Sequence, residues 1–324
     1  MKRLMTVFAS IIILVGLFST GCTGKAVENN ENNSEKNVNN AEEALWPRTI
    51  TDAAGNKVVL KEQPKKIALL HTIYLEHFLA LGTPPIASAG SSTGNAMKAV
   101  NEWETLKPYN KTADIIDLGS SRELNLEAIL EAKPDVIVTF KEHGNLDKIY
   151  DQLVQIAPVV QIDFDSSWQD QTLACAEIVG KESEAKEFIK ETESIISLSK
   201  EKLSKYNDKT IALFRTDGKS FITRGDKDYY ETFGITKPKG YPDNFETLSL
   251  EAVAEMNPDY IVFQDFTETA QTFVKTQEKS SVWNKLDAVQ KGNVIYLDDS
   301  LNTFGPLAMR LTAEKLVNIY SGQN

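Results

Sequence analysis

The feature that most constrains the fold is a stretch that the chain contains twice. Residues 124–139 read LNLEAILEAKPDVIVT and residues 248–263 read LSLEAVAEMNPDYIVF, with nine of the sixteen positions identical. Each copy predicts a short amphipathic helix, a proline-aspartate turn and a buried strand of β-branched residues. Two such units 124 residues apart indicate two lobes of similar build.

Strand and helix patterns around the two copies alternate in the same way. Residues 67–70 and 86–88 predict strands that flank a helix near residues 74–81, and residues 211–214 and 293–297 predict strands in the second lobe. Alternating strands and helices with short turns favour a mostly parallel sheet with helices on both faces. The predicted fold is therefore α/β, with two Rossmann-like lobes.

A long helical pattern separates the lobes. It runs from about Trp168 to Gly180 and from Glu182 to about Tyr206, without proline and with Gly180 as its only glycine. About 25 helical residues span roughly 37 Å, which is long enough to join two small lobes. A coiled-coil dimer is the alternative, but the apolar stripe lacks a sustained heptad repeat. We therefore expect a monomer whose lobes are joined by one long connecting α-helix.

The N-terminus has the pattern of a secretory signal peptide. Lys2 and Arg3 precede an apolar run at residues 11–18, which is too short for a stable membrane span, and Cys22 follows three small residues. Residues 25–45 are rich in Asn and Glu and predict a disordered tether. The expected divisions are a signal peptide at 1–21, a tether at 22–48, an N-terminal lobe at 49–167, a connecting helical segment at 168–206 and a C-terminal lobe at 207–324.

Charge and motif content narrow the class of protein. A net charge of −11 disfavours a nucleic-acid partner, which would need a basic surface. The sequence contains no G-x-S-x-G, H-E-x-x-H or Walker motif, so an enzyme is disfavoured. Its three histidines, His71, His77 and His143, are too scattered to favour a receptor for bare zinc or manganese. A surface-anchored enzyme and an interaction module are the alternatives from other classes.

Together these features resemble a known family. The signal peptide ends in Ser19-Thr20-Gly21-Cys22, which is similar to a bacterial lipobox although Ser19 replaces the usual leucine. With a tether, two similar α/β lobes and a long connecting helix, the chain resembles the substrate-binding lipoproteins of bacterial ABC importers. Within these it resembles the helical-backbone group that delivers ferric siderophores, haem and cobalamin.

The resemblance implies a function and a location. The protein would be a receptor without a cofactor that captures a ferric siderophore between its lobes and delivers it to an ABC permease and its ATPase. The siderophore itself would hold the iron. Lipidation of Cys22, with palmitate for example, would anchor the protein to the extracytoplasmic face of a cell membrane, as in Gram-positive surface lipoproteins. Haem or cobalamin remains the alternative ligand.

Arginines are the main candidates for ligand contact. Only six of the 35 basic residues are arginines, and Arg122, Arg215 and Arg224 lie at predicted strand ends and loops. Guanidinium groups suit oxygen-rich anionic chelates, because they form bidentate hydrogen bonds. His71 ends a strand at the carboxyl edge of a sheet, where α/β folds bind ligands. The alternative roles for the arginines are surface exposure and salt bridges between the lobes.

The remaining candidates are aromatic residues and residues of the C-terminal lobe. The further ligand-binding residues that we predict are Tyr74, Trp168, Tyr229, Phe266, Asn302, Phe304 and Arg310. Trp103 is another candidate for an aromatic wall, Trp168 also fits a packing role, and Arg310 a structural one. The resemblance implies that Glu76 and Glu231 are surface carboxylates that dock into the permease. The repeated residues themselves should be scaffold, with function at their edges.

Overall fold

The computed structural model describes residues 46–90, 95–225 and 227–322. The predicted signal peptide, the lipidated Cys22 and the tether up to residue 45 lie outside the described residues. Among the described helices, none is both long and apolar enough to span a bilayer.

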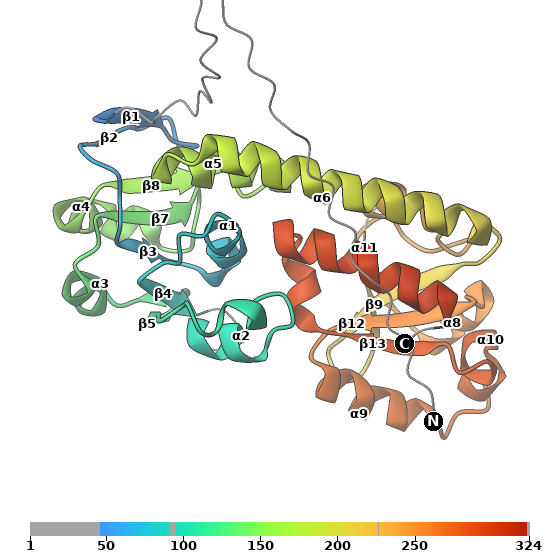
Figure 1. Cartoon of the computed structure of the whole chain (residues 1–324). Helices are drawn as coiled ribbons and strands as arrows, with labels where there is room; N and C mark the ends of the chain where they lie inside the picture. The colour runs from blue at the N-terminus through green and yellow to red at the C-terminus, as the bar shows by residue number, and fades with distance from the viewer. Residues whose placement is uncertain (1–45, 91–94, 226, 323–324) are drawn as a thin grey trace, which may run out of the picture. The chain divides into compact units, whose positions relative to one another are not determined.

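The N-terminal lobe is built on a six-stranded sheet with the order β6-β5-β4-β3-β7-β8 (Figure 1). All its strand pairs are parallel except β5 with β6, and a separate antiparallel hairpin, β1–β2, precedes it. The elements are β1 (Arg48–Thr51), β2 (Lys57–Leu60), β3 (Ile67–Leu69), η1 (Thr72–Tyr74), α1 (Leu75–Ala80), β4 (Ala87–Gly90), α2 (Ala96–Glu102), η2 (Lys107–Tyr109), β5 (Ile116–Ser120), β6 (Glu123–Leu124), α3 (Leu126–Ala132), β7 (Val136–Phe140), α4 (Leu146–Ile156) and β8 (Val159–Ile162).

The C-terminal lobe is built on a five-stranded sheet with the order β11-β10-β9-β12-β13. Strands β9, β12 and β13 are parallel, whereas β10 and β11 are antiparallel. The elements are β9 (Ile211–Thr216), β10 (Phe221–Thr223), α7 (Lys227–Phe233), β11 (Thr247–Leu248), α8 (Leu250–Met256), β12 (Tyr260–Gln264), α9 (Thr267–Gln277), η4 (Trp283–Lys285), α10 (Asp287–Gln290), β13 (Val294–Leu297), η5 (Asp299–Thr303) and α11 (Pro306–Ser321). The short turn between β9 and β10 permits only antiparallel pairing, which makes this sheet mixed.

These two sheets with their helices confirm the predicted α/β fold. Each copy of the repeat forms the predicted helix, turn and strand, α3 and β7 in the first lobe and α8 and β12 in the second. Both helices end at a residue in the left-handed conformation, Lys133 (φ 50°) and Asn257 (φ 37°), directly before the proline of the turn. Strands β7 and β12 are largely buried, and each lies between an inner strand and an edge strand of its sheet.

The connection between the lobes consists of two consecutive helices, α5 (Trp168–Val179) and α6 (Glu182–Leu203), followed by the short turn η3 (Ser204–Tyr206). Gly180 adopts φ 67° and ends α5, so the predicted break in the helical pattern falls at this residue. Helix α5 packs against α1 and β8 of the first lobe, and α6 packs against α11 of the second (Figure 1). Helix α6 also packs against α7. The limits predicted for the lobes stay a prediction.

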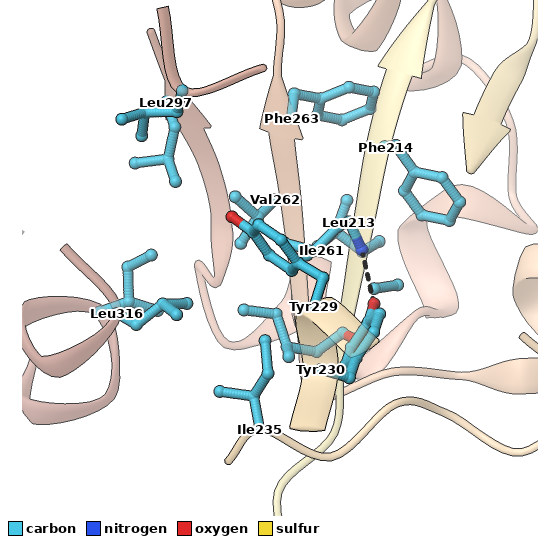
Figure 2. Packing of buried hydrophobic residues seen from close by; sticks show 14 of the residues in the cluster. Leu213, Phe214, Tyr229, Tyr230, Ile235, Ile261, Val262, Phe263, Leu297 and Leu316 are labelled. Carbon is cyan, nitrogen blue, oxygen red and sulfur yellow. Dashed lines mark hydrogen bonds between the residues drawn. The ribbon is translucent and has the colours of Figure 1, made fainter. Parts of the chain in front are cut away.

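Hydrophobic cores support the strand ends of each lobe. In the C-terminal lobe, apolar side chains of β9 and β12 pack with rings from α7 and with Leu316 of α11 (Figure 2). The N–H of Leu213 donates to the hydroxyl of Tyr230 at 3.3 Å, which ties α7 to β9. Because central strands and covering helices are held in this way, the loops that follow the strands have fixed starting points.

Candidate functional site

A cleft of about 410 Å³ lies where strands of both lobes end. His71 follows β3, Arg122 follows β5, Phe140 ends β7, and Arg215 lies near the end of β9. Ligands of α/β folds bind at this edge of the sheet. The lining residues are His71, Thr72, Ile73, Trp103, Ser121, Arg122, Phe140, His143, Gly144, Arg215, Asp299, Asn302 and Thr303.

Uncharged phenyl and imidazole rings line much of the cleft on the side of the N-terminal lobe. His143 stacks on Phe140 with their centroids 4.4 Å apart, and His71 meets both rings edge-on at 5.7 and 5.9 Å. Nδ1 of His143 lies 2.8 Å from the hydroxyl of Thr139. Burial lowers the pKa of His143, and burial together with His143 lowers the pKa of His71 to about 4. Both imidazoles are therefore neutral near pH 7.

Arg122 supplies the positive charge of the N-terminal wall. Its side chain is exposed, and its backbone N–H donates to the hydroxyl of Ser120 at 3.2 Å. The neighbouring Ser121 N–H donates to the carbonyl of Gly90, so the β5–β6 turn is anchored to β4. Arg122 thus lines the cleft from an anchored turn.

Ion pairs form the wall from the C-terminal lobe. Nη2 of Arg215 lies 3.1 Å from Oδ1 of Asp299 and 3.4 Å from Oδ1 of Asp265. Asp265 is 2% exposed and also accepts from the N–H groups of Thr216 at 2.7 Å and Phe266 at 2.8 Å. Burial raises the pKa of Asp299, while Arg215 opposes that shift. The arginine is held by two carboxylates of its own lobe.

Arg224 acts behind the cleft wall instead of lining it. Its Nε donates to Oδ1 of Asn302 at 2.5 Å and its Nη2 to the carbonyl of Asn302 at 2.6 Å. The guanidinium group lies between the rings of Phe304 and Phe245, 4.1 and 5.1 Å from their centroids. The amide of Asn302 in turn donates to Oδ1 of Asp299 at 3.1 Å. Arg224 therefore orients Asn302 and, through it, the carboxylate that holds Arg215.

Three of the predicted aromatic residues do not line the cleft. Tyr74 is fully buried against His77 and Phe140 in the N-terminal core. Tyr229 is 6% exposed, accepts from the amide of Gln264 at 2.9 Å and belongs to the C-terminal core. Phe304 packs against Tyr229 and Arg224 and does not line the cleft. For these rings, burial against apolar neighbours is more favourable in free energy than exposure in the cleft.

Three further predicted residues also lie off the cleft. Trp168 packs against the C-terminal core at the start of α5. Phe266 is 38% exposed at the start of α9. Arg310 donates to the hydroxyl of Thr192 at 3.0 Å, pairs with Glu191 at 3.3 Å and covers the ring of Phe188, so it joins α11 to α6. The packing and structural alternatives for Trp168 and Arg310 fit these contacts.

The prediction that Glu76 is a surface carboxylate was wrong. It is 1% exposed, and its Oε2 accepts from the N–H groups of Leu307 at 3.0 Å and Ala308 at 2.8 Å, at the start of α11. The hydroxyl of Thr303 donates to its Oε1. A β-carbon at Gly305 would lie 2.6 Å from Oε2, so only glycine fits there. Glu76 caps a helix of the other lobe, whereas Glu231 is exposed.

Several lining residues were not predicted. Phe140 and His143 come directly after the first repeated segment, and Asp265, which holds Arg215 from behind the lining, comes shortly after the second, so the edges of the copies carry the signal that could have found them. Asp299 and Thr303 come from the short helix η5 after β13, which no pattern in the sequence separates from an ordinary loop. The structure brings together His71, Arg122, Arg215 and Asn302 from the predicted set.

Comparisons with known proteins identify the family. The profile of the periplasmic binding protein family matches residues 67–301. The probable siderophore-binding lipoprotein YfiY of Bacillus subtilis (strain 168) is 30% identical over 294 residues, which cover 83% of this chain and 85% of YfiY. The Fe(3+)-citrate-binding protein YfmC of the same organism is 27% identical over 298 residues, 89% of this chain and 88% of YfmC.

Solved structures share the fold. Staphylococcus aureus SirA complexed with staphyloferrin B superimposes with a TM-score of 0.67 at 24% identity, over 85% of this chain and 98% of SirA. FeuA of Bacillus subtilis complexed with ferri-bacillibactin also gives 0.67, at 21% identity and with the same coverage. The family profile spans most of the chain, and the solved structures share its fold. This chain belongs to the periplasmic binding protein family.

Proposed function

We propose that the protein is the substrate-binding component of an ABC importer and captures a ferric siderophore in the cleft between its lobes. The observation that carries this proposal is the convergence of Arg122 and His71 from one lobe with Arg215 from the other. Guanidinium and imidazole N–H groups suit the oxygen atoms that surround iron in such chelates. Membership of a family of binding proteins supports a receptor over an enzyme.

The names of the relatives support the same ligand class. YfiY is named as a siderophore-binding lipoprotein and YfmC as a Fe(3+)-citrate-binding protein. SirA and FeuA were solved with staphyloferrin B and ferri-bacillibactin. These ligands differ in their chelating groups, so the shared feature is a complete iron chelate.

The lining residues favour a ligand that brings its own iron ligands. Asp299 is the carboxylate among the lining residues, and it is already paired with Arg215. Iron(III) prefers several anionic oxygen ligands. A chelate whose own oxygen atoms surround the metal needs only N–H donors from the protein, and the cleft supplies these.

Delivery requires a membrane anchor and a permease contact. We propose that Cys22 is lipidated and holds the monomer at the extracytoplasmic face of the cell membrane, as the lipoprotein names of several relatives support. Glu231, which is exposed at the end of α7, is the remaining candidate for contact with the permease. Glu76 is not a candidate for this contact, because its side chain is buried.

Titration of the purified protein with ferric chelates tests the proposal. Trp103 lines the cleft, so its fluorescence should be quenched when a ferric siderophore binds. Trp103→Phe should abolish most of the quenching while calorimetry still detects binding. Binding of haem or cobalamin, with no response to any ferric chelate, would overturn the proposal.

A further inference from the structure

The protonation state of His71 follows from one hydrogen bond. The N–H of Ile73 donates to Nδ1 of His71 at 3.1 Å. A backbone N–H can only donate, so Nδ1 must carry a lone pair. Burial and the neighbouring His143 lower the pKa of His71 to about 4, so the ring is neutral near pH 7. Its single proton must then be on Nε2.

The Nε2–H group of His71 is open to the cleft. Within the described part of the chain it has no hydrogen-bond partner, and it is not among the buried polar atoms that lack one. Phe140 and His143 contact the ring edge-on and fix its direction. His71 lines the cleft, which makes Nε2–H a fixed, neutral donor there.

The two walls of the cleft differ in how their arginines are paired. In the C-terminal lobe, Arg215 pairs with both Asp265 and Asp299, whereas Arg224 is hydrogen-bonded to Asn302 behind the cleft wall. Arg122 has no carboxylate within 4 Å among the described residues. The positive charge of Arg122 therefore has no carboxylate partner among the described residues, and it lies on the same wall as His71.

We infer that the N-terminal wall selects the ligand, with His71 Nε2–H and the Arg122 guanidinium group binding anionic oxygen atoms at the surface of the chelate. This inference rests on the proposed function and narrows it to anionic iron(III) chelates, with carboxylate or catecholate oxygens. Neutral and cationic chelates lack the charge that Arg122 would compensate. The C-terminal wall instead holds Arg215 in ion pairs with Asp265 and Asp299.

A panel of four chelates separates the possibilities. Ferric citrate and ferric enterobactin are anionic, ferrichrome is neutral and ferrioxamine B is a cation. We expect at least one anionic chelate to bind about ten-fold or more tightly than the other two classes, on the scale of one charged hydrogen bond. High salt should reduce that preference, because it screens the exposed Arg122.

The outcomes of the panel distinguish failure of this inference from failure of the proposed function. The carboxylate and catecholate arms distinguish the two sources of anionic oxygen. Equal or tighter binding of ferrichrome or ferrioxamine B would overturn the inference and leave the proposed function intact. Binding of haem or cobalamin, with no ferric chelate bound, would overturn both.

Variants then assign the selection to the two residues. His71→Leu removes the donor and should weaken the preferred anionic chelate about three- to ten-fold, whereas His71→Gln retains an N–H donor and should recover most of that loss. Arg122→Gln should reduce both affinity and its salt dependence. Lys141→Gln is the matched control, because Lys141 is an exposed cation next to β7 that does not line the cleft. Equal losses of affinity for His71→Leu and His71→Gln would contradict the inference. Equal effects of Arg122→Gln and Lys141→Gln on affinity would contradict it as well.

Discussion

In both lobes the aspartate of the repeated turn holds the start of the first strand. Oδ2 of Asp135 accepts from the N–H groups of Lys65 and Lys66 at 2.9 Å each, directly before β3. Oδ2 of Asp259 accepts from the N–H of Thr210 at 3.0 Å, directly before β9. The two copies therefore perform the same structural task at the amino end of each sheet.

At the carboxyl end of the same strands the lobes differ. Strand β7 ends at Phe140, and the chain continues through Lys141 to His143, giving a wall of neutral rings. Strand β12 is followed by Asp265, whose carboxylate holds Arg215. Equivalent scaffolds thus present different chemistry to one cleft. The ligand should meet a selective wall on one side and an ion-pair network on the other.

The largest expected effect on stability comes from replacing Asp265, the carboxylate that follows the strand of the second copy. Asp265→Ala should reduce the free energy of unfolding by about 2–4 kcal/mol, because it leaves buried N–H donors of Thr216 and Phe266 without an acceptor and removes one partner of Arg215. Urea denaturation measures the change.

Lys141 occupies the matching position after the strand of the first copy and provides the control. Its side chain is exposed. Lys141→Ala should change the free energy of unfolding by less than about 0.5 kcal/mol. Similar costs for the two variants would mean that the copies do not diverge energetically at this edge.

Ligand affinity tests the C-terminal wall next. Arg215→Ala should weaken binding of a ferric chelate by about 1.5–3 kcal/mol, because it removes charged hydrogen bonds and leaves Asp265 and Asp299 unpaired beside the ligand. Phe266→Ala is the control, since Phe266 lies at the edge of the same repeat but off the cleft. Unchanged affinity after Arg215→Ala would remove that residue from the site.

The two glutamates that the resemblance pairs provide a third test. Glu76→Ala should destabilise the protein by about 1–2 kcal/mol, because the first N–H groups of α11 lose their acceptor. Glu231→Ala, at an exposed position, should cost less. Equal costs in urea denaturation would mean that the burial of Glu76 has no energetic consequence.

The pH dependence of Glu76 has a definite sign. Burial raises its pKa from 4.5 to about 7, against the hydrogen bonds from Thr303, Leu307 and Ala308. Between these values the folded protein retains a proton that the unfolded chain has released, so the contribution of Glu76 to stability falls as pH rises from about 5 to 8. Glu76→Gln should flatten this part of the stability profile. An identical profile in the variant would contradict the raised pKa.

Local patterns were enough to predict the scaffold and part of the site. The repeated helix, turn and strand follow from residue periodicity and the proline-aspartate pair, which act over a few residues. His71 was predicted because the carboxyl edge of a parallel sheet collects ligands, and Arg122 and Arg215 because guanidinium groups at strand ends and loops suit anionic chelates. These rules need no knowledge of distant contacts.

Errors arose where distant segments decide the environment. Helix α1 is only six residues long and packs against both α5 and α11, so it has no solvent face for Glu76. The partners of Glu76 begin at Thr303, 227 residues later. Arg224 was predicted to touch ligand, but its partner Asn302 is 78 residues away. Periodicity within a short segment carries no information about such partners.

The smallest expected effect tests the part of the molecule in which the lobes agree. Asp135→Ala and Asp259→Ala should each reduce the free energy of unfolding by about 1 kcal/mol, since each removes hydrogen bonds at a partly exposed turn. The double variant should lose the sum of the two costs, because the turns belong to separate sheets. Ligand affinity should stay unchanged in all three, as neither residue lines the cleft. Strongly unequal costs in urea denaturation would show that the two turns, despite their shared geometry, do not support their sheets equally.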